Sequence, residues 1–245
     1  MKDPVRGSNG FWSTLRQGGM PSAIASMMGA PSAQQMAFIR SLMREQRKPE
    51  VLHVPLSKLE TVVFDLETTG FSCQHGDEIL SFGAVRMNGR EILDEQFYTL
   101  VNCKTVIPAA ITELTGITQE MTNQAPPLIE GLHDFMSFVG GRVLVAHASA
   151  HDRAFLNAAL WKTSKVNLSH RIIDTMMIAR WLEPHLGSYS LDQLLHEHHI
   201  PNEGRHHALE DAKMTAKLWA AYLEQIAARH QIVTLGDLYA YLSNA

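Results

Sequence analysis

The chain has 245 residues, of which 45% are hydrophobic, and this is enough for one α/β domain with a substantial core plus an extra segment. Its formal net charge is −4. Its two cysteines form no CxxC pair, and this argues against a disulfide framework or a cysteine-based zinc site. A reducing, cytoplasmic compartment is therefore favoured. No apolar run reaches the roughly 18 residues of a membrane span, so no membrane partner is expected.

The N-terminal part of the chain is basic. Residues 1–58 carry 8 Lys or Arg and 3 Asp or Glu, whereas residues 59–245 carry 13 and 22. An acidic body with a basic extension suits a metal enzyme that acts on a polyanion, although a solvated basic tail would give the same balance. Because this end is poor in acidic residues, an organellar transit peptide is an alternative to a cytoplasmic location.

One amphipathic helix is predicted near the N-terminus. Residues 1–31 are rich in Gly, Ser, Met and Pro without a period, and we expect them to be mobile. Ser32 can cap a helix that runs to Lys48 and ends before Pro49. The helix could dock on the body, on a partner or beside a substrate, and docking on the body is the more common outcome. Its apolar face comprises Met36, Ile39 and Met43.

We divide the chain into a basic extension, residues 1–57, and a main domain, residues 58–245. The main domain opens with three strands in hairpin order, of which the second and third are joined at Asn88-Gly89, a strong turn signal. The strands are predicted at 61–67, 78–87 and 90–101.

Helices and strands alternate through the rest of the main domain, after a predicted loop at 107–127. Residues 172–182 begin as a strand and turn helical, and Ser190 caps a later helix. This order predicts a mixed sheet with helices on both sides. The other elements are a helix at 128–140, a strand at 142–148, and helices at 152–163, 190–199, 208–230 and from Thr234.

Residues 64–70, FDLETTG, place two carboxylates in a strand that is otherwise apolar. Side chains alternate along a strand, so Asp65 and Glu67 point the same way and repel each other unless a cation or a shared proton lies between them. A divalent metal would resolve the repulsion. Two solvated strand-end carboxylates are the alternative, and this segment alone does not exclude it.

Two further acidic residues lie where α/β folds gather active-site groups. Asp152 follows a strand end at the start of a helix, and Asp211 lies one turn into the long helix. Four carboxylates can hold two hard divalent ions such as Mg²⁺ or Mn²⁺. His206 precedes Asp211 by five residues, and its imidazole could reach a reacting water. His207 competes for that role.

Three motifs identify a family. FDLETTG, AHASAHDRAFL (146–156) and HHALEDA (206–212) resemble, in order and spacing, the three motifs of the DnaQ-like (DEDDh) 3′–5′ exonucleases, to which proofreading subunits of bacterial DNA polymerase III belong. The segments TELTGIT (112–118) and APP are similar to the family's loop before the second motif. The resemblance covers about residues 60–228. It implies an α/β, RNase H-like (ribonuclease H-like) mixed β-sheet flanked by helices, here with an N-terminal helical extension.

The resemblance also implies the roles of individual residues. His206 would be the general base, and the backbone of Thr68 and Thr69 would contact the 3′-terminal nucleotide. Nucleoside 5′-monophosphates would be released from the 3′ end. Two ions, Mg²⁺ or Mn²⁺, would be held by Asp65, Glu67, Asp152 and Asp211. The terminal base and sugar would be lined by Leu66, Leu114 and Thr115.

The second motif departs from the family pattern. The family usually has His-Asn-Ala-x-Phe-Asp, whereas this chain has His147-Ala148-Ser149-Ala150-His151-Asp152. The missing Asn and Phe could reduce activity or alter the choice of substrate. All five chemical residues remain, so an active enzyme is expected. Asp174 and His147 are interpreted as structural, and the sequence HEHH (196–199) lacks a third ligand for zinc.

Three functions are compatible with these motifs. The favoured one is a metal-dependent 3′–5′ exonuclease on single-stranded or frayed DNA, in proofreading or repair. The second is the same chemistry on RNA, which the sequence does not distinguish because the expected contacts are largely to backbone and sugar. The third is a catalytically weak module that binds 3′ ends or a polymerase. The expected partners are a nucleic acid with a free 3′ end and a DNA polymerase subunit.

Overall fold

The computed structural model describes residues 33–45, 49–229 and 232–243. The segment predicted to be mobile, 1–31, lies outside these residues, as do the predicted cap Ser32 and residues 46–48 of the predicted helix.

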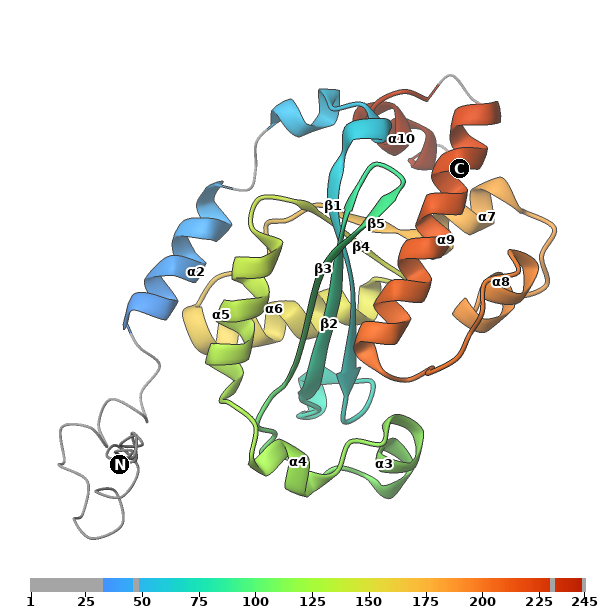
Figure 1. Cartoon of the computed structure of the whole chain (residues 1–245). Helices are drawn as coiled ribbons and strands as arrows, with labels where there is room; N and C mark the ends of the chain where they lie inside the picture. The colour runs from blue at the N-terminus through green and yellow to red at the C-terminus, as the bar shows by residue number, and fades with distance from the viewer. Residues whose placement is uncertain (1–32, 46–48, 230–231, 244–245) are drawn as a thin grey trace, which may run out of the picture.

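A five-stranded mixed sheet in the order β3-β2-β1-β4-β5 forms the centre of the molecule (Figure 1). β1 (Glu60–Thr68), β2 (Ile79–Asn88) and β3 (Glu91–Leu100) form an antiparallel meander. β4 (Val143–Ala146) and β5 (Ile172–Asp174) continue the sheet parallel to β1. The hairpin forms one residue later than predicted: Asn88 pairs with Glu91, so the turn residues are Gly89 and Arg90, and Gly89 supplies the positive φ, 55°. The predicted mixed sheet is confirmed.

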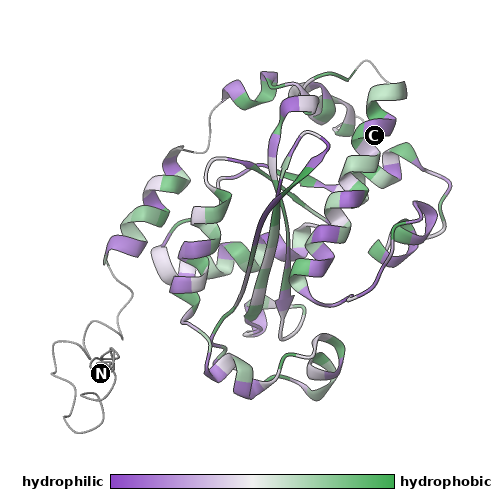
Figure 2. Cartoon of the chain, in the orientation of Figure 1, coloured by the Kyte–Doolittle hydropathy of each residue, from purple (hydrophilic) through white to green (hydrophobic). Residues whose placement is uncertain are grey.

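Helices cover both faces of the sheet. α5 (Leu128–Val139) and α6 (Ala150–Ser164) lie on one face, and α9 (Ala208–Arg229) lies on the other (Figure 1). In Figure 2 these helices carry both hydrophobic and hydrophilic residues, as expected for helices with one buried side. Three further α-helices of the main body are α7 (Thr175–Leu182), α8 (Leu191–Glu197) and α10 (Leu235–Leu242). Short 3₁₀ turns are formed by η2 (Pro49–His53), η3 (Leu56–Lys58) and η4 (Cys73–His75).

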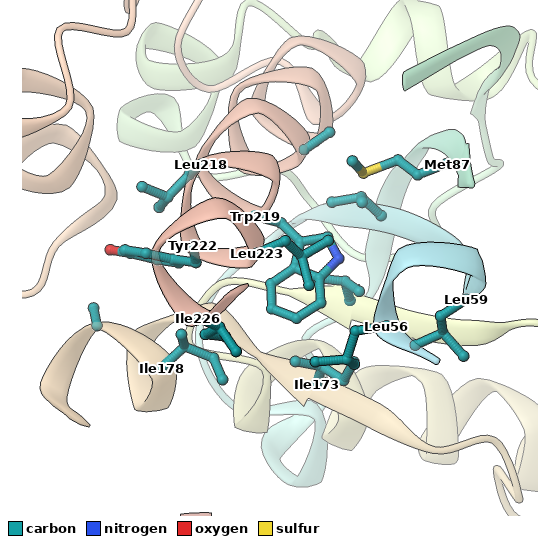
Figure 3. Close-up of a cluster of buried hydrophobic side chains, with 14 of the residues drawn as sticks. Leu56, Leu59, Met87, Ile173, Ile178, Leu218, Trp219, Tyr222, Leu223 and Ile226 are labelled. Atoms are coloured by element: carbon teal, nitrogen blue, oxygen red, sulfur yellow. The ribbon is translucent and has the colours of Figure 1, made fainter. Parts of the chain in front are cut away.

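The two faces of the sheet have separate cores, and β1 contributes to both. Val63 belongs to the cluster under α9, whereas Val62 and Phe64 belong to the cluster under α5 and α6. Figure 3 shows part of the first cluster, in which Trp219 of α9 lies close to Leu56 and Ile173. Because side chains alternate along β1, Asp65 and Glu67 lie on the same face as Val63, which is the face covered by α9.

The prediction that residues 107–127 form a loop without helices is wrong. It contains two short helices, α3 (Ala109–Thr115) and α4 (Gln119–Asn123). Gly116, with a φ of 72°, ends the first, and the Thr118 hydroxyl caps the second by accepting a hydrogen bond from the Met121 N–H. Helices of seven and five residues are too short to show a readable hydrophobic period, so the sequence pattern did not reveal them.

The described part of the N-terminal extension packs on the main domain. In α2 (Ala33–Glu45), Ile39 and Met43 are buried in the same cluster as α5 and α6. Arg40 Nε donates to the Ser164 carbonyl at 2.9 Å, and Ser169 Oγ donates to the Met43 carbonyl at 2.6 Å. The helix therefore contributes to the core, and the division of the chain at residue 57 stays a prediction. No helix within the described ranges is both long and apolar enough to cross a bilayer.

Candidate active site

Three carboxylates meet between β1 and the start of α9. Asp65 and Glu67 come from β1, and Asp211 lies in the first turn of α9. One oxygen from each side chain lies within 4.8 Å of those of the other two, a spacing that a metal ion could bridge. Within the described part of the chain, this is the one such group of His, Cys, Asp or Glu, so the histidines at 196–199 do not form another.

A glycine on β2 allows α9 to come this close. Gly83 lies in register with Asp65, and a Cβ at Gly83 would overlap the backbone of Ala208 and Leu209. The first turn of α9 thus rests directly on the sheet beside Asp65. Our interpretation of the sequence missed Gly83, although a glycine inside a strand signals a close backbone approach.

Asp152 approaches the other three carboxylates from the opposite layer, after the loop between β4 and α6, and its charge acts on Asp65, but it is not part of their 4.8 Å group. The carboxylate of Asp174 fixes this loop, because it accepts hydrogen bonds from the Ala148 N–H at 3.1 Å and the Ser149 N–H at 2.9 Å. Asp152 then lies in the first turn of α6 with 3% of its surface exposed. Asp174 therefore acts structurally, as its sequence context indicated.

Burial and neighbouring negative charges raise the pKa values of Asp65, Glu67 and Asp152. Burial raises the pKa of Asp65 well above its usual range, and the charges of Asp152, Asp211 and Glu67 raise it further. Burial and then the Asp211 charge raise the pKa of Glu67 to about 7. Burial is also the main cause that raises the pKa of Asp152, to about 8. Without a cation, the folded protein disfavours the charged form of these groups.

Two oxygens in the cluster lack hydrogen-bond partners. Asp152 Oδ1 and Asp211 Oδ1 are buried, and no described residue donates to either. Buried carboxylate oxygens are normally satisfied, because an unpaired one carries the full desolvation penalty. Unpartnered oxygens in an all-carboxylate donor set fit hard divalent cations.

An arginine that our interpretation of the sequence did not single out also enters the cluster. Arg205 Nη1 donates to Asp211 Oδ2, and Arg205 Nε donates to Asp192 Oδ1 at 2.6 Å. The positive charge of Arg205 lowers the pKa values of Asp65 and Glu67, against the larger effect of burial. Its one signal in the sequence is its position directly before His206.

His206 and His207 have different surroundings. His206 adopts a φ of 63°, unusual for a residue with a side chain, and its N–H donates to Asp211 Oδ2 at 3.2 Å. It lines a cavity of about 480 Å³ together with Asp65 and Asp211. His207 instead stacks on Tyr98 of β3, with ring centroids 4.4 Å apart, and does not line that cavity.

Four of the five residues predicted to contact the terminal nucleotide line the same cavity, namely Leu66, Thr68, Leu114 and Thr115. Thr69 does not. Its side chain is buried, where Thr69 Oγ1 donates to Asp77 Oδ1 at 3.2 Å, and its N–H donates to the Glu78 carbonyl at 2.9 Å. Both groups thus stabilise the loop behind the cavity.

The altered second motif forms part of the cavity wall. Ala148, with a φ of 52°, and His151 both line the cavity. The His151 ring contacts Phe155, with centroids 4.6 Å apart, and its Nε2 lies 3.3 Å from Thr68 Oγ1. His147 is held by Thr175 Oγ1 and the Tyr189 carbonyl, each 3.0 Å from a ring nitrogen, and burial lowers its pKa. His147 is therefore a hydrogen-bonded structural residue.

Comparisons with known proteins agree on one kind of domain. A sequence model of the family described as "Exonuclease" matches residues 62–219. The chain is 42% identical over 188 residues to a DNA polymerase III PolC-type of Clostridium perfringens, covering 76% of this chain and 13% of that protein. It is 38% identical over 199 residues to a DNA polymerase III subunit epsilon-like protein of Rhodobacter capsulatus, covering 80% and 28%.

Solved structures share the fold at lower sequence identity. The nuclease domain of 3′hExo, a DEDDh family member, bound to rAMP, superposes with a TM-score of 0.60 at 21% identity, covering 70% of this chain and 95% of that one. Exonuclease X in complex with 5′ overhanging duplex DNA gives a TM-score of 0.56 at 20% identity, covering 73% and 99%. The ribonuclease H-like sheet expected from the motifs is the fold found.

Proposed function

The chain belongs to the exonuclease family whose sequence model it matches over residues 62–219, and from this membership we propose that it is a metal-dependent 3′–5′ exonuclease of the DEDDh type. The observation that carries the proposal is the convergence of carboxylates from β1 and α9 around one cavity that His206 also lines, with Asp152 of α6 close enough for its charge to raise the pKa of Asp65. The chain spans only 13% and 28% of the length of the two relatives named above, so the activity of those whole proteins is not transferred.

Two divalent ions, Mg²⁺ or Mn²⁺, would be held by Asp65, Glu67, Asp152 and Asp211. The all-oxygen donor set and the two unpartnered buried oxygens support this assignment. When bound, such ions stabilise negative charge on the attacking and leaving oxygens of a phosphodiester. The four carboxylates also count against a non-catalytic module. They repel one another, and a site without catalytic activity would have no physical need to keep four such acidic residues together.

His206 would act as the general base. It lines the cavity beside the carboxylates, and a neutral imidazole accepts a proton efficiently near physiological pH. The proton would come from the attacking water, whose oxygen forms the new bond to phosphorus. The bond from phosphorus to the 3′ oxygen of the preceding nucleotide breaks, that oxygen takes a proton from solvent to become a 3′-hydroxyl, and the phosphate stays on the 5′ oxygen of the released nucleoside.

The cavity wall would hold the terminal nucleotide. A volume of about 480 Å³ lies within the range of about 300–1,000 Å³ found for small-molecule sites. Leu66 and Leu114 would offer apolar contacts, Thr115 would line the base and sugar with them, and the backbone of Thr68 would contact the nucleotide. Thr69 would support this wall from behind, because both its side chain and its N–H are already bonded.

Single-stranded or frayed DNA, in proofreading or repair, is the proposed substrate, and a DNA polymerase subunit is the proposed partner. The names of the polymerase III relatives support both. An exoribonuclease is the alternative, favoured by one specific observation. A structural neighbour carries rAMP, and the altered residues Ala148 and His151 lie in the wall that would contact the sugar. A cytoplasmic location stays a prediction.

A 5′-labelled oligonucleotide assay tests the function. Matched single-stranded DNA and RNA are incubated with Mg²⁺, Mn²⁺ or EDTA and with wild type, Asp65→Ala, His206→Ala or His207→Ala. We expect a metal-dependent ladder that shortens from the 3′ end, is abolished by Asp65→Ala, is slowed by roughly 10²–10⁴-fold in His206→Ala and persists in His207→Ala. Absence of cleavage by folded wild type with metal would contradict the proposal and make the binding module the leading function.

A further inference from the structure

Arg205 lies between two acidic residues of different elements. Through Nε it donates to Asp192 Oδ1, in the first turn of α8, and through Nη1 to Asp211 Oδ2, in the first turn of α9. The two partners differ in environment, because the side chain of Asp192 is 56% exposed whereas that of Asp211 is 6% exposed. One guanidinium therefore links a surface carboxylate to a buried carboxylate of the site.

The contact with Arg205 engages one of the two carboxylate oxygens of Asp211 and leaves the other unpartnered within the described ranges. Asp211 Oδ2 already accepts from Arg205 Nη1 and from the His206 N–H, whereas Asp211 Oδ1 has no partner among the described residues. The Arg205 charge also acts on Asp65 and Glu67. In the metal-free protein, the positive charge of Arg205 thus balances part of the negative charge of the acidic cluster.

A divalent ion and Arg205 compete for the negative charge of the same carboxylates. A metal placed among Asp65, Glu67 and Asp211 repels the guanidinium, so binding weakens or breaks the contact with Asp211. The contact with Asp192 lies away from the cluster and does not have to break. Arg205 can therefore be displaced without leaving the cavity wall, because its Nε stays bound to α8.

We propose that Arg205 is a built-in cation that occupies the acidic cluster before metal binds and competes with the metal for Asp211, and that it thereby sets the metal affinity of the site. This inference rests on the proposed metal-dependent function. Arg205 acts through Asp211, so it is a positioning residue, and its effect is measured on metal binding in the absence of substrate.

Mn²⁺ titration of the metal-free full chain, read by isothermal calorimetry, tests the inference. Replacing Arg205 by Gln removes the competing charge, so we expect Arg205→Gln to bind Mn²⁺ about tenfold more tightly, equivalent to about 1.4 kcal/mol. Arg205→Lys keeps the charge and is expected to stay close to wild type. Lys162→Gln is the matched control for net charge, because Lys162 pairs with Glu78 away from the cluster.

The outcomes separate this inference from the function on which it rests. If wild type binds Mn²⁺ no better than Asp65→Ala, the metal proposal fails, and this inference fails with it. If wild type binds and Arg205→Gln shows the affinity of Lys162→Gln or a weaker one, only the role of Arg205 is overturned.

A second measurement does not depend on how well Arg205→Gln folds. The Nε–H signal of Arg205 can be observed in the nitrogen-15 NMR spectrum of wild type and assigned by its loss in Arg205→Lys. We expect Mg²⁺ to shift this signal, because the guanidinium loses its contact with Asp211. A signal that stays unchanged while Mg²⁺ saturates the site would overturn the inference.

Discussion

Asp65 on β1 and Gly83 on β2 are paired across the sheet, and the missing side chain of Gly83 makes room for the first turn of α9 beside Asp65. The catalytic arrangement therefore depends on a residue without functional groups. Asp211 reaches the carboxylates of β1 because nothing separates α9 from the sheet at this point.

Gly83→Ala should displace α9. Its Cβ would overlap the backbone of Ala208 and Leu209, which cannot rotate aside as a side chain can. We expect a loss of stability of about 1–3 kcal/mol in chemical denaturation and weaker Mn²⁺ binding. Gly187→Ala is the control, because a Cβ there meets nothing within 4 Å, and it should change stability by less than about 0.5 kcal/mol. Equal effects of both variants would show that α9 adjusts freely.

Ala148→Gly should stabilise the protein. Ala148 has a φ of 52°, a left-handed conformation that costs a residue with a Cβ about 1–2 kcal/mol. Relief of that strain exceeds the entropic cost of glycine, about 0.5–1 kcal/mol, so a net gain near 0.5 kcal/mol is expected in the free energy of unfolding. Ala158→Gly, inside α6, pays the entropic cost without relief and should lose stability. An equal loss of stability in Ala148→Gly and Ala158→Gly would show that the backbone at Ala148 is not strained.

Without metal, stability should fall as the pH rises from about 4 to 8. The pKa of Asp152 is raised from 3.8 to about 8 in the folded state, and that of Glu67 from 4.5 to about 7. The folded protein therefore holds these protons more tightly than the unfolded chain, and the resulting stability is complete below about pH 4 and is lost as the pH rises through the folded-state values. Thermal unfolding in EDTA across this range measures the fall.

Asp152→Asn identifies the source of that fall. An amide does not ionise, so this variant should flatten the pH dependence and be more stable than wild type by a few kcal/mol at pH 8 in EDTA, while losing Mn²⁺ binding. Asp94→Asn, on the exposed edge strand β3, should leave the pH profile unchanged. A wild-type profile that is flat in EDTA would show that burial does not raise the pKa values of Asp152 and Glu67 in the folded protein.

Ile39→Ala should destabilise the whole domain, although it lies in the N-terminal extension. Ile39 is fully buried against α5 and α6, and removing such a side chain costs about 2–5 kcal/mol. Phe38→Ala, one position along the same helix, removes a ring that is 38% exposed and should cost less than Ile39→Ala, because part of the ring already contacts water. If Ile39→Ala unfolded at the same denaturant concentration as wild type, α2 would be a separate appendage.

Local signals in the sequence were sufficient for most of the fold. The strands, the hairpin between β2 and β3, the cap Ser190 and the start of the last helix near Thr234 were predictable, because periodicity, turn geometry and capping involve residues only a few positions apart. The shared face of Asp65 and Glu67 followed from the same alternation. The three motifs placed the carboxylates and His206 in one chemical set before any contact was known.

Only the tertiary structure decided the contacts between distant segments. It buried Thr69 behind the cavity, placed Ile39 of the extension in the core and stabilised the two short helices at 109–123. It also set Gly83 against α9 and Arg205 between Asp192 and Asp211. The physical reason is that packing and charge pairing depend on distances in space, and residues far apart in the chain leave no periodic trace of their proximity in the sequence.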